Sequence, residues 1–285
     1  CFASPDIVIT LLDAGARVET TDIMGNDSFM AACGMGRLDN VKMWFERFSR
    51  WNINRKNTKF GSSALNLTLF MGPRKMDLVK YLVEDCDASL FTVNHGGYSA
   101  LSLACENEDA DPKVIRYLLQ RNNLDVNMKV VAQNLTWKII RLISTIGYVS
   151  RITHSKVLQL IAEEGGMTAL HYAARRGDVE IVELLMEYKA NPSIKNDLGR
   201  DVLSYCESFP EIKGAIQRVK REAKRVQQNK NKTSSKSSSK SGLVSRVKSR
   251  APSQAPTMGT SSSSSSFTLQ RRLSTATDIK YDMYL

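Results

Sequence analysis

The chain has 285 residues, and 42% of them are apolar, which is enough for a sizeable hydrophobic core. This composition excludes a wholly disordered chain, a collagen-like chain and a small disulfide-bonded scaffold. The formal net charge is +11, but residues 1–212 hold 24 basic and 26 acidic side chains, whereas residues 213–285 hold 16 and 3. The basic excess therefore belongs to the C-terminal quarter.

The cysteines and the hydropathy indicate a reducing compartment. Five cysteines are present, an odd number, and no two have the C-x-x-C spacing of a metal or redox motif. No stretch reaches the ~18 consecutive apolar residues of a membrane-spanning helix. We expect a cytoplasmic or nuclear protein. Because the chain starts with Cys1 and not with Met, we interpret it as part of a longer polypeptide.

In chain order, the first feature is a recurring segment that opens with glycine. The openings are Gly25, Gly61, Gly97, Gly166 and Gly199, in steps of 36, 36, 69 and 33 residues. After each opening come small and apolar residues, as in GYSALSLAC from Gly97. A fixed period of this size predicts stacked structural repeats.

A helical pattern follows four of these openings, and another copy of it precedes the first. Apolar residues recur at i, i+3 and i+4, the spacing of one buried helix face. These stretches are Val8–Leu12, Val41–Phe45, Leu78–Leu82, Val114–Leu119 and Ile181–Met186. They predict the second helix of these repeats.

The step of 69 residues leaves residues 131–163 open to two interpretations. It equals 36 plus 33, so a degenerate repeat that starts near Gln133 would preserve the period. The alternative is an insertion of unrelated structure. We favour the degenerate repeat because the register survives across it, and we expect Trp137–Ile143 to pack in its core.

The clearest copy carries a family resemblance. Residues 166–177 read GMTALHYAARRG, and IVELL follows from Ile181. This copy resembles the ankyrin repeat, with its G-x-T-P-L-H-x-A-A-x-x-G and I-V-x-L-L elements, although Ala169 replaces the usual proline. The resemblance covers roughly residues 5–225. It implies an all-α ankyrin-repeat solenoid with short β-hairpin fingers.

The resemblance divides the chain into repeats. We expect a partial repeat at 1–22, repeats at 23–58, 59–94, 95–130 and 164–196, and a capping repeat at 197–228 whose second helix starts at Pro210. Cys33, Cys105 and Cys206 stand at or beside small-residue positions of the repeats, so we predict that they are buried.

The C-terminal residues have a different composition. Residues 229–270 are rich in Ser and Lys, with few large apolar side chains, and predict a disordered basic linker. In residues 271–285, two arginines precede Ser274, a pattern that basophilic kinases read, so Ser274 is a candidate phosphorylation site. Residues 279–285 regain apolar character and indicate the start of a further segment.

The resemblance implies a scaffold that binds a protein partner through its finger tips and the concave face of its first helices. Carried over by position, the finger candidates are Asn54, Arg55, Lys56, Asn57, Asn94, His95, Lys195, Asn196 and Asp197. The concave candidates are Met35, Leu67, Phe70, Glu106, Tyr172, Arg175 and Arg176. Among these we favour Phe70 and Tyr172, since aromatic side chains dominate binding hot spots.

Motifs for catalysis or metal binding are not found in the sequence. It contains no G-x-S-x-G, H-E-x-x-H, P-loop or G-x-G-x-x-G. In ankyrin repeats the histidine of the T-x-L-H element holds the turn, so His171 is expected to be structural. The acidic clusters Glu163–Glu164 and Glu106–Asp111 are interpreted as solvated turns. We therefore expect no enzyme activity, no cofactor and no small-molecule substrate.

Three alternatives remain at this point. The array can be the regulatory module of a larger enzyme or membrane channel. The basic stretch from Lys213 to Arg250 can neutralise nucleic-acid phosphates, but it lacks interleaved aromatics for base stacking. Within it, Arg218 to Arg225 can act as a nuclear import signal. Residues 137–143 resemble a basic amphipathic segment. Core packing is the favoured interpretation of that segment, which argues against a membrane role.

Overall fold

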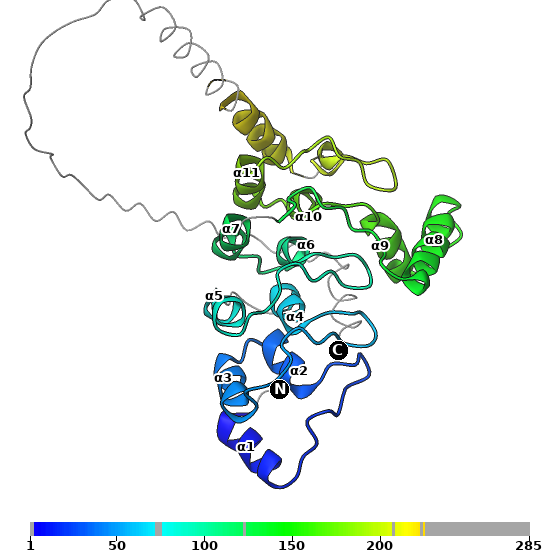
Figure 1. The fold of residues 1–285 in the computed structure, drawn as a ribbon. Helices are drawn as coiled ribbons and strands as arrows, with labels where there is room; N and C mark the ends of the chain where they lie inside the picture. The colour runs from blue at the N-terminus through cyan, green and yellow to red at the C-terminus, as the bar shows by residue number, and fades with distance from the viewer. Residues whose placement is uncertain (1–2, 72–75, 122–123, 207–208, 223–224, 226–285) are drawn as a thin grey trace, which may run out of the picture.

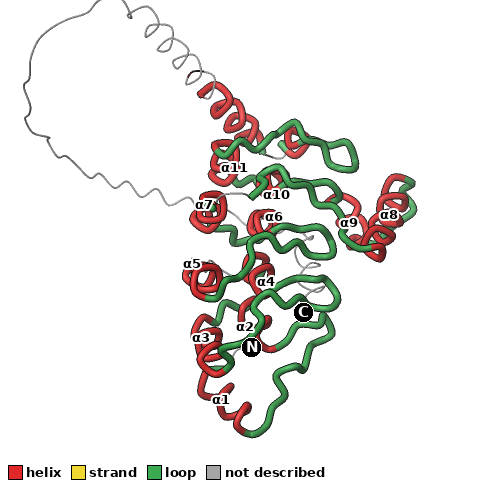
Figure 2. Tube along the Cα trace, in the orientation of Figure 1, coloured by secondary structure: helices red, strands yellow, loops and turns green. Residues whose placement is uncertain are grey.

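The computed structural model describes residues 3–71, 76–121, 124–206, 209–222 and 225. These residues form an elongated stack of helices in two rows, joined by loops that project to one side (Figures 1 and 2). The predictions for residues 229–270 and 271–285, including Ser274, lie outside the described residues.

The inner row packs helix on helix along the stack. It consists of α2 (Ser28–Gly34), α4 (Ala64–Phe70), α6 (Ala100–Glu106), α10 (Ala169–Arg176) and the short 3-10 helix η2 (Val202–Tyr205). Each of these contacts the next in that order. The predicted ankyrin-type, all-α array is confirmed.

The outer row contains the helices predicted from the apolar spacing. They are α1 (Pro5–Asp13), α3 (Leu38–Arg47), α5 (Met76–Lys80) with the π-helical turn η1 (Tyr81–Asp85), α7 (Pro112–Gln120) and α11 (Val179–Glu187). Residues 210–222 are also helical and begin at Pro210, as predicted.

The glycine segments position the start of each inner helix. Two residues after each glycine stands a residue that caps the helix, such as Ser63, whose hydroxyl accepts the backbone N–H of Asn66. At the glycine itself the backbone turns sharply. Gly97 has φ +96°, and a Cβ there would lie 2.2 Å from the carbonyl oxygen of Val131. Any larger residue would strain the turn and push the neighbouring finger away.

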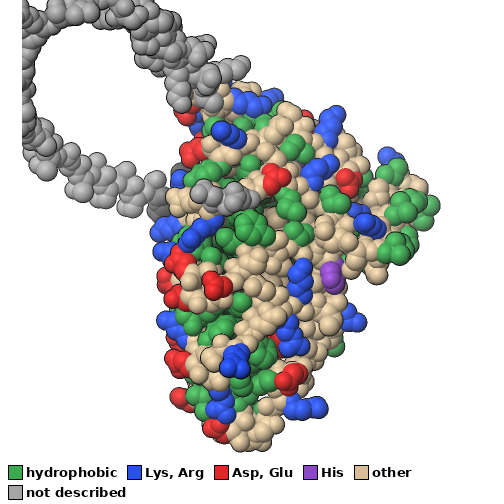
Figure 3. Space-filling view, in the orientation of Figure 1, with side chains coloured by type: hydrophobic (Ala, Val, Ile, Leu, Met, Phe, Trp, Pro, Cys, Tyr) green, Lys and Arg blue, Asp and Glu red, His purple; other side chains and the backbone are tan. Residues whose placement is uncertain are grey.

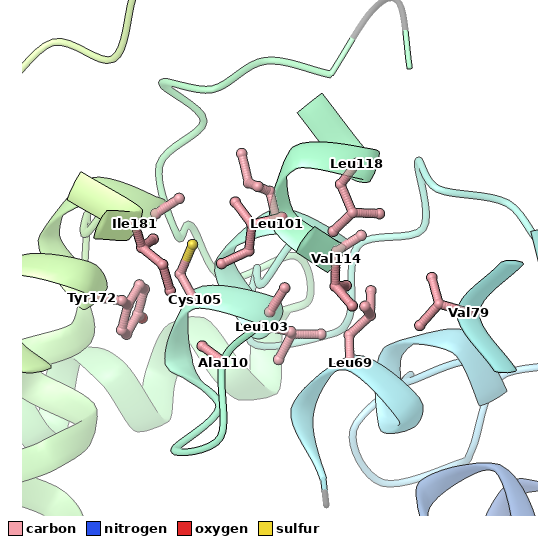
Figure 4. Packing of buried hydrophobic residues seen from close by; sticks show 14 of the residues in the cluster. Leu69, Val79, Leu101, Leu103, Cys105, Ala110, Val114, Leu118, Tyr172 and Ile181 are labelled. Atoms are coloured by element: carbon pink, nitrogen blue, oxygen red, sulfur yellow. The ribbon is translucent and has the colours of Figure 1, made fainter. Parts of the chain in front are cut away.

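The core lies between the two rows and continues from repeat to repeat. Figure 4 shows Cys105 of α6 between Leu101 of its own helix and Ile181 and Tyr172 of the next repeat. Cys33, Cys105 and Cys206 are all buried, which confirms the prediction for them. Small side chains at these positions allow neighbouring inner helices to approach closely.

The fingers are turns closed by single bridges. Thr21 pairs with Asp27, and Lys56 pairs with Ser63. In the ranges that the structure describes, no longer strand is formed. The β-hairpin character of the fingers is therefore limited to one ladder step.

Residues 131–165 do not form a repeat of the stack. α10 packs directly on α6, and α11 packs on α7, so no place is left between them. The inserted residues form α8 (Leu135–Val149) and α9 (Lys156–Glu164), which pack on each other beside the stack (Figure 1). The preference for a degenerate repeat is therefore wrong, and the insertion is the correct alternative.

Backbone hydrogen bonds locate the insertion within one finger. The N–H of Val130 donates to the carbonyl of Met167 at 2.8 Å, and the N–H of Gly166 donates to that of Val130 at 2.9 Å. The same two bonds join Asn94 to Tyr98 and Gly97 to Asn94 in the preceding finger. Two residues separate Asn94 from Gly97, whereas thirty-five separate Val130 from Gly166.

Candidate protein-binding surface

Asparagines close the fingers from inside and are not available to a partner. The Asn94 side-chain oxygen accepts the backbone N–H of Tyr98 at 2.9 Å. The Asn57 oxygen accepts the N–H of Ser62 at 3.0 Å, and the Asn196 oxygen accepts that of Arg200 at 2.9 Å. All three side chains are at most 4% exposed. The prediction that Asn57, Asn94 and Asn196 contact a partner is corrected.

The asparagine amides also link one finger to the next. Asn57 Nδ2 donates to Asn26 Oδ1 at 2.7 Å, and Asn196 Nδ2 donates to the carbonyl of Glu163 at 3.2 Å. Farther from the tips, Asn54 Oδ1 accepts the backbone N–H of Ser89 at 2.8 Å. These bonds make the row of fingers a preorganised edge.

Other predicted finger residues remain accessible on this edge. Asn54, Lys56, Lys195 and Asp197 are exposed, and His95 is half-buried. Lys56 Nζ donates to the carbonyl of Val93 at 3.0 Å, so its ammonium group is oriented. Arg55 is half-buried, 3.6 Å from the carboxylate of Asp27. These residues remain candidates.

Several residues predicted to bind a partner on the concave face are buried. Leu67 is 2% exposed, Glu106 is 9% exposed and Tyr172 has no exposed surface. A buried side chain presents no surface to a partner, so the predicted contacts at these residues are corrected. Met35, Phe70, Arg175 and Arg176 are half-buried. Arg176 is oriented by a hydrogen bond to the carbonyl of Glu108.

An ion-pair network explains the burial in the middle of the concave face. Arg175 Nη2 lies 2.6 Å from Glu106 Oε2 and 3.4 Å from Glu164 Oε1. Glu164 belongs to α9 and also accepts a hydrogen bond from the hydroxyl of Tyr98. Burial raises the pKa of Glu164, and the positive charge of Arg175 opposes that shift. The network anchors the insertion to the stack.

The insertion leaves little free space where it meets Phe70 and Tyr98 of the stack. A cavity of only about 30 Å³ remains there, lined by residues that include Phe70, Tyr98, Trp137, Ile161 and Glu164. This is too small for any ligand larger than a water molecule. Phe70 therefore faces the protein's own insertion, and the central concave surface is already occupied.

The network also corrects the interpretation of the acidic clusters. Glu106 and Glu164 are buried ion-pair partners and are not parts of solvated turns. In the sequence their charges looked unmatched because Arg175 lies 69 residues from Glu106. Pairing across such a distance has no local sequence signal.

His171 has the structural role predicted for it. Its Nδ1 accepts the backbone N–H of Thr168 at 3.1 Å, which closes the start of α10 as part of a capping box. The side chain is fully buried, and this burial lowers its pKa to about 4. A neutral imidazole is therefore built into the turn.

Comparison with known families agrees with this architecture. A model described as "Ankyrin repeats (3 copies)" matches residues 29–130, and a model described as "Ankyrin repeat" matches residues 165–197. The chain is an ankyrin repeat protein. The residues between the two matches, 131–164, are nearly the same as those that form the insertion. Ankyrin repeats are in general protein–protein interaction modules.

One curated relative shares part of the array. The "Putative ankyrin repeat protein L92" of Acanthamoeba polyphaga mimivirus is 40% identical over 67 residues. That match covers 20% of this chain and 16% of the relative. The chain therefore spans only a small part of the relative's length, and the similarity concerns the repeats.

Two further findings concern the described residues alone. None of the helices there is both long enough and apolar enough to cross a bilayer. No group of three or more His, Cys, Asp or Glu side chains in the same residues is arranged to bind a metal ion.

Proposed function

We propose that this chain is a non-catalytic scaffold that binds an acidic protein segment along the edge formed by its fingers. The observation that carries the proposal is the exposure of three lysines on hydrogen-bonded fingers: Lys56 and Lys59 on a finger bonded to both of its neighbours, and Lys195 on a finger bonded to the insertion. Figure 3 shows Lys and Arg side chains spread along this edge. Asp197 is the exposed acid beside Lys195.

Physical reasons favour the finger edge over the concave face. The central concave surface is covered by α9, so a partner there would have to displace the ion pairs of Arg175. The fingers need no such rearrangement. Their inter-repeat hydrogen bonds reduce the entropy lost on binding, which improves affinity. Like-signed lysines on one edge also steer an acidic partner toward it.

Charge reversal tests this proposal. The variant Lys56→Glu, Lys59→Glu, Lys195→Glu is expected to lose the partners that the wild type retains in quantitative affinity purification. The control variant Lys80→Glu, Lys113→Glu, Lys213→Glu changes the net charge equally at exposed lysines of the outer helices. It should retain them. Equal loss in both variants would indicate non-specific attraction and would refute the finger edge.

A further inference from the structure

The outward face of α8 is apolar along its whole length. Six large aliphatic side chains on it are between 47% and 71% exposed: Leu135, Ile139, Leu142, Ile143, Ile146 and Val149. Because an α-helix turns by about 100° per residue, these six side chains fall within an arc of roughly 120° around the helix axis. Figure 3 shows apolar side chains gathered on the projecting part of the molecule where α8 lies. The expectation that residues 137–143 pack in a core is therefore wrong for Ile139, Leu142 and Ile143.

Polar groups on the opposite face fix this orientation. Arg141 and Ser144 are buried against the protein. Arg141 donates to the carbonyl of Val130 at 2.7 Å and to that of Gly96 at 3.0 Å. Rotating α8 to bury its aliphatic face would break these charged hydrogen bonds. The side of α8 that carries Arg141 and Ser144 thus faces the protein, and its aliphatic side faces solvent.

The chain segment that carries this face is basic. From Val126 to Ala162 the chain has five basic residues and no acidic residue. Lys138 is exposed on α8, and Arg151 and His154 are exposed just after its C-terminal end. A cavity of about 520 Å³ adjoins that end, lined by residues that include Val149, Arg151, His154 and Arg200. Two acids lie nearby, and both have a basic partner: Glu163 lies 3.4 Å from Arg200, and Asp197, which lines a cavity with Lys138 and Leu142, lies 3.9 Å from Lys129.

We propose that α8 docks on an anionic lipid bilayer. The helix lies in the plane of the interface, with its aliphatic face among the upper acyl chains and Lys138 at the headgroups. The basic cavity at its end takes a lipid phosphate. Anionic lipids attract each nearby basic residue, so the apolar and charged contributions act together.

The charge pattern favours this occupant over two others. A second copy of α8 would bring Lys138 and Arg151 against like charges, which opposes self-association. An acidic protein helix would satisfy the charges, but it would need a groove, and α8 presents a projecting single-helix surface beside the stack (Figure 1). A bilayer accepts such a surface without a complementary shape.

Vesicle flotation with the full chain tests the proposal. The wild type is expected to float with vesicles of phosphatidylcholine and phosphatidylserine, and much less with phosphatidylcholine alone. The variant Leu142→Ser, Ile143→Ser, Ile146→Ser should bind the anionic vesicles at least about tenfold more weakly. The control variant Ile23→Ser, Phe91→Ser, Leu203→Ser removes as many exposed apolar side chains elsewhere and should bind like the wild type.

The variants separate α8 from the other basic parts of the chain. All of them retain residues 213–285, so any attraction due to that basic region is the same in each. In addition, Lys138→Gln and Arg151→Gln should each weaken binding to anionic vesicles about fivefold. The charge-reversal variant of the fingers should still float with the vesicles. The membrane proposal and the proposed function can therefore be refuted independently of each other.

Three results would overturn the assignment. One is equal flotation of the wild type and the α8 serine variant, because the bound surface then lies elsewhere. Another is a wild-type dimer in sedimentation that the α8 variant abolishes, without vesicle binding, which would assign the face to a second copy. The third is binding of an acidic amphipathic peptide in place of vesicles. Unchanged circular dichroism and unfolding of the α8 variant serve as the folding control.

Discussion

The stack and the insertion use the same helical spacing of apolar residues in opposite ways. In α11, Ile181, Leu184 and Leu185 are turned toward the neighbouring helices and are at most 2% exposed. In α8, Leu142 and Ile146 have the same type of spacing and are more than half exposed. Apolar periodicity therefore predicts a helix with one apolar face, but it does not predict what that face contacts.

The contacts that hold α11 and α8 in place determine whether the apolar face of each helix is buried or exposed. α11 is held by its apolar contacts with α7 and α10. α8 is held by Arg141, whose guanidinium reaches two backbone carbonyls of the stack. Charge-assisted hydrogen bonds of this kind are strong enough to orient a helix against its apolar preference. The insertion is therefore attached to the stack through the hydrogen bonds of Arg141 and the ring contact of Trp137 with Phe60, whereas the aliphatic face of α8 is left free.

The largest effect is expected at the ion pairs that join the two regions. Arg175→Met removes the partner of Glu106 and Glu164, which are both buried. Leaving buried carboxylates unpaired should lower the free energy of unfolding by about 3–5 kcal/mol in urea denaturation. Arg218→Met breaks the exposed pair with Glu183 and should change it by less than about 1 kcal/mol. Similar losses in both variants would mean that the network is not buried in solution.

Two leucines test the packing directly. Leu170→Ala in α10 empties a fully buried site and should cost about 2–5 kcal/mol of unfolding free energy. Leu142→Ala in α8 removes a side chain that is 60% exposed and should change the same quantity by less than about 0.5 kcal/mol. A loss at Leu142 comparable to that at Leu170 would show that the α8 face is covered within the protein.

The stack should also lose stability in acid through His171. Its folded pKa of about 4 lies below the usual 6.5, so the unfolded chain binds a proton that the folded chain excludes. The stabilisation is complete above the unfolded pKa and is lost as the pH falls from 6.5 toward 4. It should amount to roughly 3 kcal/mol.

Comparison with a variant isolates this contribution. His171→Asn should flatten the fall in unfolding free energy between neutral pH and pH ~4.5, although it lowers stability at neutral pH by removing the cap. His154→Asn, at an exposed position of the insertion, is the control and should retain the wild-type slope. Identical slopes in all three proteins would exclude His171 as the titrating group.

The sequence predicted the repeats well because each repeat carries its own local signals. A glycine turn, a cap two residues later and an apolar stripe suffice to place α2, α4, α6 and α10. The insertion was misread because its thirty-five residues exceed the two of the preceding finger by 33, the length of one repeat. The length of the insertion therefore kept the spacing of the glycines consistent with an additional repeat, although no repeat is present there.

A local signal of the insertion was nevertheless present. In four fingers an Asp or Asn accepts the backbone N–H of the returning arm, namely Asp22, Asn57, Asn94 and Asn196. Val130 holds the corresponding place at the insertion and has no acceptor in its side chain. The ion pair of Arg175 with Glu106 had no such signal, since the two residues are 69 positions apart in the chain. For that reason the concave candidates were predicted less well than the fold.

The smallest effect is expected when an ordinary finger is made like the inserted one. Asn94→Val copies the residue of the insertion and leaves the N–H of Tyr98 without its side-chain acceptor. The free energy of unfolding should fall by about 1–2 kcal/mol, and hydrogen exchange at Tyr98 should accelerate. Asn54→Ala, which removes hydrogen bonds that are exposed to solvent, should cost less. If Asn94→Val changed neither quantity, the asparagines would not be what keeps the fingers rigid, and the preorganised edge of the proposed function would lose its physical basis.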